Sequence, residues 1–489
     1  MMPTPRWTRR AIPRAAAVIV AWLTLIPVAG PLAAQYDVVV AGGRVIDPES
    51  GLDAVRWIGV TGGKIVVISR EPIAGARLID ASGLVVAPGF IDLHVHGQDD
   101  ENYRIKAMDG VTTALELEVG TGDVGKWYAD REGRALINYG VSASHIKARM
   151  AVFHDPGGLL PSGEAGHALA SQAQIDEMLE QIRRGLRDGG LGIGMGIQYT
   201  PAATRWEILE VFRLAAEFAA PVFVHVRSFG TAEPGSSVES FLEVIGDAAL
   251  TGAPLHIVHL NSMSLASTPQ TIRIVHEARD RGIDVTTEAY PYSAGMTEIQ
   301  SALLDQYENA PDSIYARMQW VQTGERLTKA SFARYRKAGG GVILHLNTPA
   351  MEAMAITSPL TAIASDGALE NGKGHPRQAG TYARVLGHYV RETGSLSLME
   401  ALRKMTLLPA QRLERWAPAL RFKGRIAVGA DADIVAFDAA RVTDRSTYAK
   451  PAIPSEGFRH VLVNGVPVVF DGSIVEGRKP GHAVRAPRR

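Results

Sequence analysis

Between residues 88 and 415 the sequence alternates short apolar runs, typical of buried strands, with longer runs of helical periodicity. The predicted strands are 90–96, 112–118, 142–148, 191–198, 221–225, 254–259, 283–290 and 362–366. Helices are predicted between them, for example over 172–188, 206–219, 238–250 and 269–281. This alternation predicts an α/β fold, a (β/α)8 barrel of the TIM type.

Two further regions, one on each side of this alternation, have short strand-like runs separated by glycine turns. We therefore expect one small β-sandwich domain formed by residues 35–87 and 416–480, with the barrel over 88–415. The stretch 294–360 is too long for a plain strand-to-helix connection, so an extra helical excursion over the active-site face is expected there.

The first 34 residues have the pattern of a signal peptide. Four arginines precede an apolar run over 15–30, and small residues follow with a predicted cleavage site after Ala34. The pair Arg9-Arg10 resembles a twin-arginine export signal, with Sec export and an uncleaved anchor as alternatives. We expect an exported protein, periplasmic or secreted, with no stable membrane span after cleavage.

The charge balance and the absence of cysteine limit the function classes. Lys+Arg and Asp+Glu both number 51, which gives no reason to expect nucleic acid or an acidic membrane as a partner. Without cysteine there is no disulfide framework and no thiolate nucleophile or ligand. Any metal must be held by His, Asp, Glu or a modified Lys.

His94 and His96 lie two apart at the end of the first predicted strand. Alternate side chains of a strand point to the same face, so both imidazoles can bind one metal ion. The alternative is a pair of structural histidines on a half-buried strand.

Polar residues also end other predicted strands of the barrel, where the catalytic residues of such barrels gather. They are Glu116 and Glu118, His225, His259 and Asp366. Several strand-end histidines with an aspartate are hard to explain as core residues, so the pattern predicts a metal site, with zinc as the default ion.

With these strand-end residues, the sequence resembles the amidohydrolase superfamily, and most closely its D-aminoacylase (N-acyl-D-amino-acid deacylase) branch. The resemblance extends over residues 36–480. Its motifs are the 87–97 segment, Gly110-Val111-Thr112-Thr113, Ala289-Tyr290-Pro291-Tyr292, Ser365-Asp366-Gly367 and His375-Pro376-Arg377.

The resemblance implies two metal positions. His225 and His259 would hold one ion; His94, His96 and Asp366 would hold the other. The branch places a bridging cysteine after the Gly-Val-Thr-Thr turn. We expect Glu118 to take that place, with Glu116, or a carboxylated Lys147 at the end of the third strand, as alternatives.

A second departure from the branch concerns the substrate. The branch has a lysine two residues after the strand-end histidine, where it helps to hold the substrate carboxylate, and this chain has Asn261. Arg377 and Tyr292 are the remaining candidates for carboxylate binding.

These residues predict amide hydrolysis by metal-activated water. Asp366 would orient the water, take its proton and give it to the departing nitrogen. The expected substrate is a small linear N-acyl-D-amino acid or related N-acyl compound. A cyclic-amide or D-dipeptide hydrolase is the alternative, and a non-catalytic metal- or ligand-binding barrel is a third hypothesis. One or two Zn2+ ions are expected, with cobalt, manganese or nickel as possible replacements.

Overall fold

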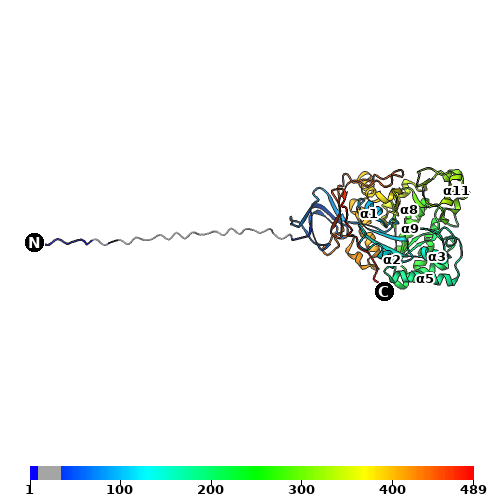
Figure 1. The fold of residues 1–489 in the computed structure, drawn as a ribbon, viewed down its shortest axis with the longest axis horizontal. Coiled ribbons are helices and arrows are strands. Elements are labelled where there is room, and N and C mark those ends of the chain that lie inside the picture. The colour runs from blue at the N-terminus through cyan, green and yellow to red at the C-terminus, as the bar shows by residue number, and fades with distance from the viewer. Residues whose placement is uncertain (9–10, 12–34) are drawn as a thin grey trace.

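The computed structural model describes residues 1–8, 11 and 35–489, which Figure 1 draws in colour. The predicted signal peptide falls largely outside the described residues, so it stays a prediction. Within the part of the chain that is described, no helix combines the length and the apolar character needed to cross a bilayer.

The centre of the molecule is a sheet of eight parallel strands in the order β16-β12-β11-β10-β9-β8-β7-β6. Helices connect successive strands, as parallel pairing requires. The strands are β6 (Phe90–Asp92), β7 (Val111–Thr121), β8 (Asn138–Ser144), β9 (Ile193–Gly196), β10 (Val222–His225), β11 (Leu255–Ile257), β12 (Val285–Ala289) and β16 (Thr361–Ile363). The predicted TIM-type barrel is confirmed.

The two edge strands of this sheet meet through the segments that follow them. The backbone N–H of Asp366, after β16, donates to the carbonyl of His94, after β6, at 2.8 Å. The N–H of His96 donates to the carbonyl of Gly367 at 2.9 Å. These bonds bring the carboxyl ends of the first and last strands side by side.

Several helices around the barrel begin at a polar side chain that accepts a hydrogen bond from the first turn. Ser171 and Gln174 form a capping box at the start of α5, and Thr204 and Ser236 cap α6 and α7. The helices are α1 (Asp100–Ala107), α2 (Val124–Ala129), α3 (His145–Val152), α4 (Glu164–His167), α5 (Gln172–Arg187), η1 (Ile197–Tyr199), α6 (Arg205–Phe218), α7 (Ser237–Thr251), α8 (Leu260–Ser264), η2 (Leu265–Ser267), α9 (Thr268–Asp280), α13 (Arg377–Arg384), η4 (Val385–Glu392), α14 (Leu398–Met405), α15 (Leu407–Leu413) and η5 (Pro418–Phe422).

The second domain is one sheet of nine strands drawn from both ends of the chain. β5 pairs antiparallel with β19, which joins the two contributions, and Val40, Ile58 and Leu462 lie in its buried core. Its strands are β1 (Val38–Asp47), β2 (Leu52–Thr61), β3 (Lys64–Ser69), β4 (Arg77–Asp80), β5 (Val85–Pro88), β19 (Ile434–Phe437), β20 (Phe458–Val463), β21 (Val466–Phe470) and β22 (Ser473–Ile474). The predicted β domain built from both chain ends is confirmed.

The stretch 294–360 contains helices, as predicted, and also a three-stranded antiparallel sheet, β13-β15-β14, that was not predicted. Figure 1 shows this insertion, with α11, at the end of the molecule opposite the first strands. Its elements are β13 (Gly295–Glu298), η3 (Ala302–Tyr307), α10 (Asp312–Tyr315), β14 (Met318–Trp320), α11 (Lys329–Ala338), β15 (Gly341–Leu344) and α12 (Pro349–Thr357). A further hairpin, β17 (Leu369–Glu370) and β18 (Lys373–Gly374), follows β16.

The insertion is packed onto the barrel rather than standing free. Its core residues Leu304, Tyr315 and Trp320 belong to the same apolar cluster as Ile146 of α3 and Tyr199 of η1. This packing places the insertion over the carboxyl ends of the barrel strands.

Candidate metal centre

Six buried or nearly buried side chains converge at the carboxyl ends of the barrel strands. Each comes from the end of a strand or from the residues that follow it, where parallel strands present their last side chains to one space. They are His94, His96, Glu118, His225, His259 and Asp366.

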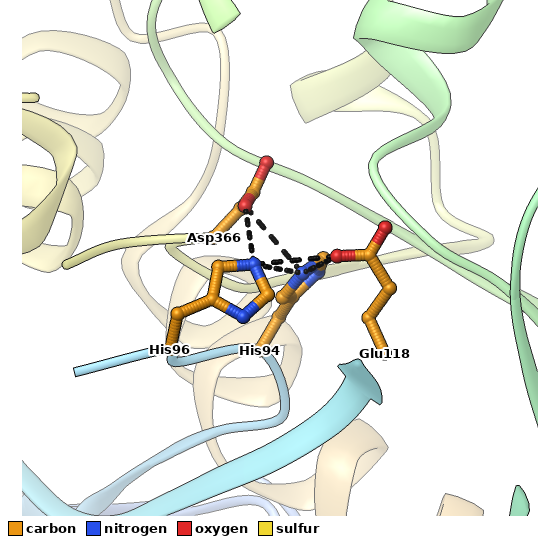
Figure 2. A group of neighbouring side chains, drawn as sticks. All are labelled: His94, His96, Glu118 and Asp366. Atoms are coloured by element: carbon orange, nitrogen blue, oxygen red, sulfur yellow. Dashed lines mark hydrogen bonds and ion pairs between the residues drawn. The ribbon is translucent and has the colours of Figure 1, made fainter. Parts of the chain in front are cut away.

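Four of them form one group of possible ligands, shown in Figure 2. The ligand atoms of His94, His96, Glu118 and Asp366 all lie within 4.8 Å of one another. His94 Nε2 is 2.9 Å from Glu118 Oε2, and His96 Nε2 is 3.2 Å from Asp366 Oδ1. Two imidazole nitrogens and two carboxylate oxygens suit a divalent cation such as zinc.

Glu118 also belongs to a second group, with His225 and His259. Its Oε1 lies 2.7 Å from His225 Nδ1 and 3.5 Å from His259 Nε2, whereas its Oε2 faces the first group. One carboxylate therefore presents one oxygen to each group, which is the arrangement needed to bridge two cations.

The electrostatics of the centre fit a bound cation. Burial disfavours protonated His94, but the charges of Asp366, Glu118 and Glu288 outweigh burial and raise the pKa of His94 well above its ordinary value. Burial raises the pKa of Glu118, but the surrounding histidines, with His94 foremost, bring it well below its usual range. Positive charge therefore stabilises the buried carboxylates. A metal ion that displaces the protons from the neighbouring histidines would supply that charge.

Outer partners fix the orientation of three imidazoles. Glu288 of β12 accepts from His94 Nδ1 at 2.6 Å and lies 3.1 Å from His256 Nε2. Glu116 Oε2 lies 2.7 Å from His96 Nδ1, and Gln198 Oε1 lies 2.8 Å from His225 Nε2. Such partners set which ring nitrogen is free to bind a metal.

The same contacts separate the alternatives for the bridge. Glu116 is committed to His96 and to the backbone N–H of Val119, at 3.1 Å, so it does not face both groups. Lys147 is not at a strand end, because β8 stops at Ser144 and the Ser144 side chain caps α3. Its Nζ donates to the carbonyl of Leu159, at 2.9 Å.

Arg377, the first residue of α13, holds Asp366. Its NH1 is 2.8 Å from Asp366 Oδ2, and its guanidinium lies 4.5 Å from the centre of the Tyr290 ring. Burial opposes ionisation of Asp366, but Arg377 first and His94 next bring the pKa of this carboxyl well below its usual range. The predicted carboxylate-binding arginine therefore touches the predicted proton carrier.

The other two predicted substrate-binding residues line neither of the two cavities that adjoin Asp366. The chain turns sharply after β12, with a 3.0 Å bond from the N–H of Tyr292 to the carbonyl of Tyr290, so the Tyr292 hydroxyl lies 3.4 Å from Asp444 instead. The Asn261 amide donates to the carbonyl of Tyr290 at 3.1 Å. Their neighbours Tyr290 and Ser262 line a cavity beside Asp366.

Three residues near the centre were not expected from sequence: Gln198, Tyr199 and His256. The Tyr199 ring lies 4.5 Å from that of His225, and Gln198 and His256 form the hydrogen bonds described above. Gln198 follows a strand-like apolar run, which is the same signal that identified His225. His256 lies in the middle of β11 rather than at its end, so in the sequence it resembles an ordinary core residue.

Comparisons with known proteins agree with this geometry. The model of the amidohydrolase family matches residues 77–469. N-acyl-D-glutamate deacylase from Alcaligenes xylosoxydans xylosoxydans is 30% identical over 92% of this chain and 97% of its own length. D-aminoacylase from the same organism is 29% identical over 88% and 94%. The solved N-acyl-D-glutamate deacylase of Bordetella bronchiseptica, in complex with zinc and a phosphonate inhibitor, is 26% identical with a TM-score of 0.78 over 92% of this chain and 100% of that one.

Proposed function

Since this chain belongs to the amidohydrolase family, in its D-aminoacylase branch, and is a metal-dependent hydrolase of carbon–nitrogen bonds, we propose that it releases the amine of an N-acyl-D-amino acid. The observation that carries the proposal is the pair of ligand groups sharing Glu118, with Asp366 at their edge. The names of the similar deacylases support the N-acyl-D-amino acid as the substrate class.

In this proposal His94, His96 and Asp366 would hold one divalent cation, His225 and His259 would hold a second, and Glu118 would offer one oxygen to each. A cation bound there supplies Lewis acidity and lowers the pKa of water to about 7. Zinc is the proposed ion, supported by the His-rich donor set and by the zinc complex of the Bordetella relative.

Asp366 is the proposed proton carrier. Its Oδ2 is fixed by Arg377, while its Oδ1 points at His96 Nε2, at the edge of the cavities. Oδ1 of Asp366 would take a proton from the attacking water and return it to the departing nitrogen, while Oδ2 stays paired with Arg377. Burial of the centre keeps bulk water from competing for that proton.

The test is amine release by residues 35–489 from matched N-acetyl-D- and N-acetyl-L-amino acids, with and without a chelator. We expect turnover of D-substrates that the chelator abolishes. Asp366→Asn should bind the same substrates and release no amine. Turnover that survives complete metal removal would contradict the proposal.

We also propose that the protein is exported before it acts. The arginine-rich start, the apolar run over 15–30 and the small residues before position 35 support this proposal. Fractionation of cells expressing the full chain tests it: activity in the periplasm or medium, with an N-terminus near residue 35, is expected, and activity confined to the cytosol with an intact N-terminus is not.

A further inference from the structure

Besides the two cavities at Asp366, the protein has a larger cavity, of about 820 Å³, at the other end of the barrel. The wall of this basal cavity includes Pro221, Pro254 and Asp284, each of which directly precedes a barrel strand. The metal centre lies at the opposite ends of the same strands, so the two sites are separate. No step of the proposed hydrolysis uses the basal cavity.

The wall of the basal cavity carries more positive than negative charge. It includes five arginines, Arg279, Arg403, Arg412, Arg415 and Arg489, and two carboxylates, Asp284 and Glu414. Glu414 is paired with Arg425, outside the wall, at 3.1 Å. Arg403 is paired with Glu400 at 2.7 Å. Asp284 is therefore the side-chain carboxylate of this wall that remains for three arginines, Arg279, Arg412 and Arg415.

Arg412, in α15, is almost completely enclosed. Its side chain is 4% exposed, and its NH1 donates to Asp284 Oδ1 at 2.7 Å. Its Nε is buried and has no hydrogen-bond partner among the described residues. A buried N–H without an acceptor is costly, so an acceptor atom in the cavity that reaches this guanidinium would stabilise it.

Arg279 and Arg415 add positive charge beside Arg412. Arg279, in α9, donates to the carbonyl of Val285 at 2.8 Å, next to Asp284, so Arg279 and Arg412 reach the same turn before β12. Arg415 follows α15 and is exposed. Burial lowers the pKa of Arg412, Asp284 opposes this effect, and repulsion by Arg279 and Arg415 lowers the pKa further. An anion among the three guanidinium groups would relieve that repulsion.

A purely structural role accounts for only part of this arrangement. It explains Arg279, which satisfies a backbone carbonyl, and Arg403, which has its own carboxylate. It leaves Arg412 Nε without an acceptor and places Arg415 close enough to repel Arg412. A ligand with several acceptor oxygens would remove both costs.

The number of charges indicates the chemistry of this ligand. Guanidinium groups bind carboxylates and phosphates through paired N–H donors. A monocarboxylate brings one negative charge, whereas a phosphate group brings roughly two at pH 7 and offers oxygens in several directions. Phe218 and Trp416 also line the wall, so the organic part of a phosphate ester would find apolar surface there.

We propose that the basal cavity binds a phosphate group, as free phosphate or as part of a small phosphate ester, between Arg279, Arg412 and Arg415. This site goes beyond the proposed function and does not depend on it. Phosphate binding there is expected whether or not the protein releases amines from N-acyl-D-amino acids.

The first experiment titrates inorganic phosphate into the zinc-loaded protein by calorimetry, with chloride keeping the ionic strength constant. We expect a Kd below about 1 mM and a Kd at least about 10-fold higher in Arg415→Gln. Arg273→Gln, at an 80% exposed side chain of α9, is the matched control and should bind like wild type. No saturable binding up to about 20 mM phosphate would overturn the inference. Equal affinity in Arg415→Gln and wild type would also overturn it, because the phosphate would then lie elsewhere, for example at the metal centre.

Asp284→Asn gives a test of opposite sign. Asp284 is 47% exposed and competes with the anion for Arg412, so we expect its replacement to lower the Kd for phosphate at least about 3-fold. If Asp284 and Arg412 are only a structural pair, the folded variant should bind phosphate no better than wild type, which would contradict the inference. Arg412→Gln should abolish binding. If that buried variant does not fold, Arg415→Gln and Asp284→Asn still decide.

Glycerol 3-phosphate, titrated in the same way, distinguishes the two sources of the phosphate group. Tighter binding than that of inorganic phosphate would identify an ester as the ligand, and weaker binding would identify the free ion. Amine release by Arg415→Gln should equal that of wild type, which shows that the variant is folded and that the site is separate from the metal centre. Arginine-dependent phosphate binding in a protein without amidase activity would contradict the proposed function and keep the basal site.

Discussion

Arg377 and Asp366 form a buried ion pair in which NH1 lies 2.8 Å from Oδ2. Asp366 turns its other oxygen to His96, at 3.2 Å, so its two oxygens face a guanidinium and a candidate metal position. Arg377 itself is only 2% exposed and stacks on Tyr290. This contact makes the orientation of Asp366 dependent on a residue that sequence reasoning assigned to the substrate.

Replacing Arg377 distinguishes a residue that positions Asp366 from a residue that binds the substrate carboxylate. If Arg377 positions Asp366, Arg377→Lys should lower kcat about 100-fold with little change in KM, because a lysine cannot reproduce both the ion pair and the stacking. A rise in KM alone, restricted to substrates with a carboxylate, would instead identify Arg377 as the substrate clamp. Steady-state kinetics on N-acetyl-D-methionine and its amide decide between them, with metal content checked in parallel.

Glu118 should control how many metal ions the protein holds. Glu118→Gln removes the charge that both ligand groups share, so we expect metal content to fall from two ions per chain to at most one. Glu118→Cys should retain more metal, since a thiolate can also bridge. Elemental analysis after dialysis measures this, and two retained ions in Glu118→Gln would rule out the bridge.

Glu288 should tune metal affinity without touching the metal. It is 2.6 Å from His94 Nδ1, and the loss of such an outer partner typically costs about 10- to 100-fold in affinity. Glu288→Gln should therefore weaken metal binding in a competition with a fluorescent chelator. Glu277→Gln, on the exposed face of α9, is the control and should change nothing.

Thr297 lies where the two cavities meet, and its hydroxyl is buried without a hydrogen-bond partner among the described residues. A substrate amide can provide that partner. Thr297→Val should raise KM by about 5- to 20-fold, whereas Thr297→Ser should retain the wild-type value. A wild-type KM in Thr297→Val together with a raised KM in Thr297→Ser would contradict this role, because it would show that the methyl group and not the hydroxyl matters.

The buried Lys404 should make the folded protein less stable as the pH falls. Its side chain is fully buried and donates to the carbonyl of Ser358, and burial lowers its pKa to about 7 from an ordinary value of 10.5. Between these values the unfolded chain binds the proton and the folded chain does not, so lowering the pH favours unfolding by about 1.4 kcal/mol per pH unit.

Lys404→Met removes this dependence. Its stability relative to wild type should improve as the pH is lowered from 9.5 to 7.5, as measured by urea unfolding at both values. The loss of the hydrogen bond to Ser358 changes the free energy of unfolding by the same amount at both pH values. It therefore does not affect the comparison of the pH dependence. Lys337→Met, at an exposed site on α11, should show no such change, and an identical slope in Lys404→Met and wild type would contradict the assignment.

The barrel could be predicted because each buried strand appears in the sequence as its own short apolar run. His225 and Asp366 each end such a run, and the carboxyl ends of parallel strands meet by geometry alone. The residue pattern alone did not separate Glu116 from Glu118, because both share one strand face, and the preference for Glu118 came from the resemblance. A register irregularity in β7 between Glu116 and Thr121 accompanies their different partners.

Other differences have local causes. Lys147 was placed on a strand because the predicted strand, 142–148, extends past Ser144, but the cap formed by that serine starts a helix. The strands of the insertion are three or four residues long, too short for a periodic signal. Tyr292 was predicted to bind the substrate, but its hydroxyl lies elsewhere because the chain turns sharply after β12. The residue pattern of this segment does not indicate that turn.

The most direct test of the central claim is the addition of Zn2+ to metal-free protein, residues 35–489, with amine release from N-acetyl-D-methionine followed throughout. We predict that activity is absent without metal, rises with added Zn2+ and reaches a plateau by two ions per chain, and that zinc-loaded Asp366→Asn shows no turnover. Activity already present in the metal-free protein, or none when two ions are bound, would contradict the account.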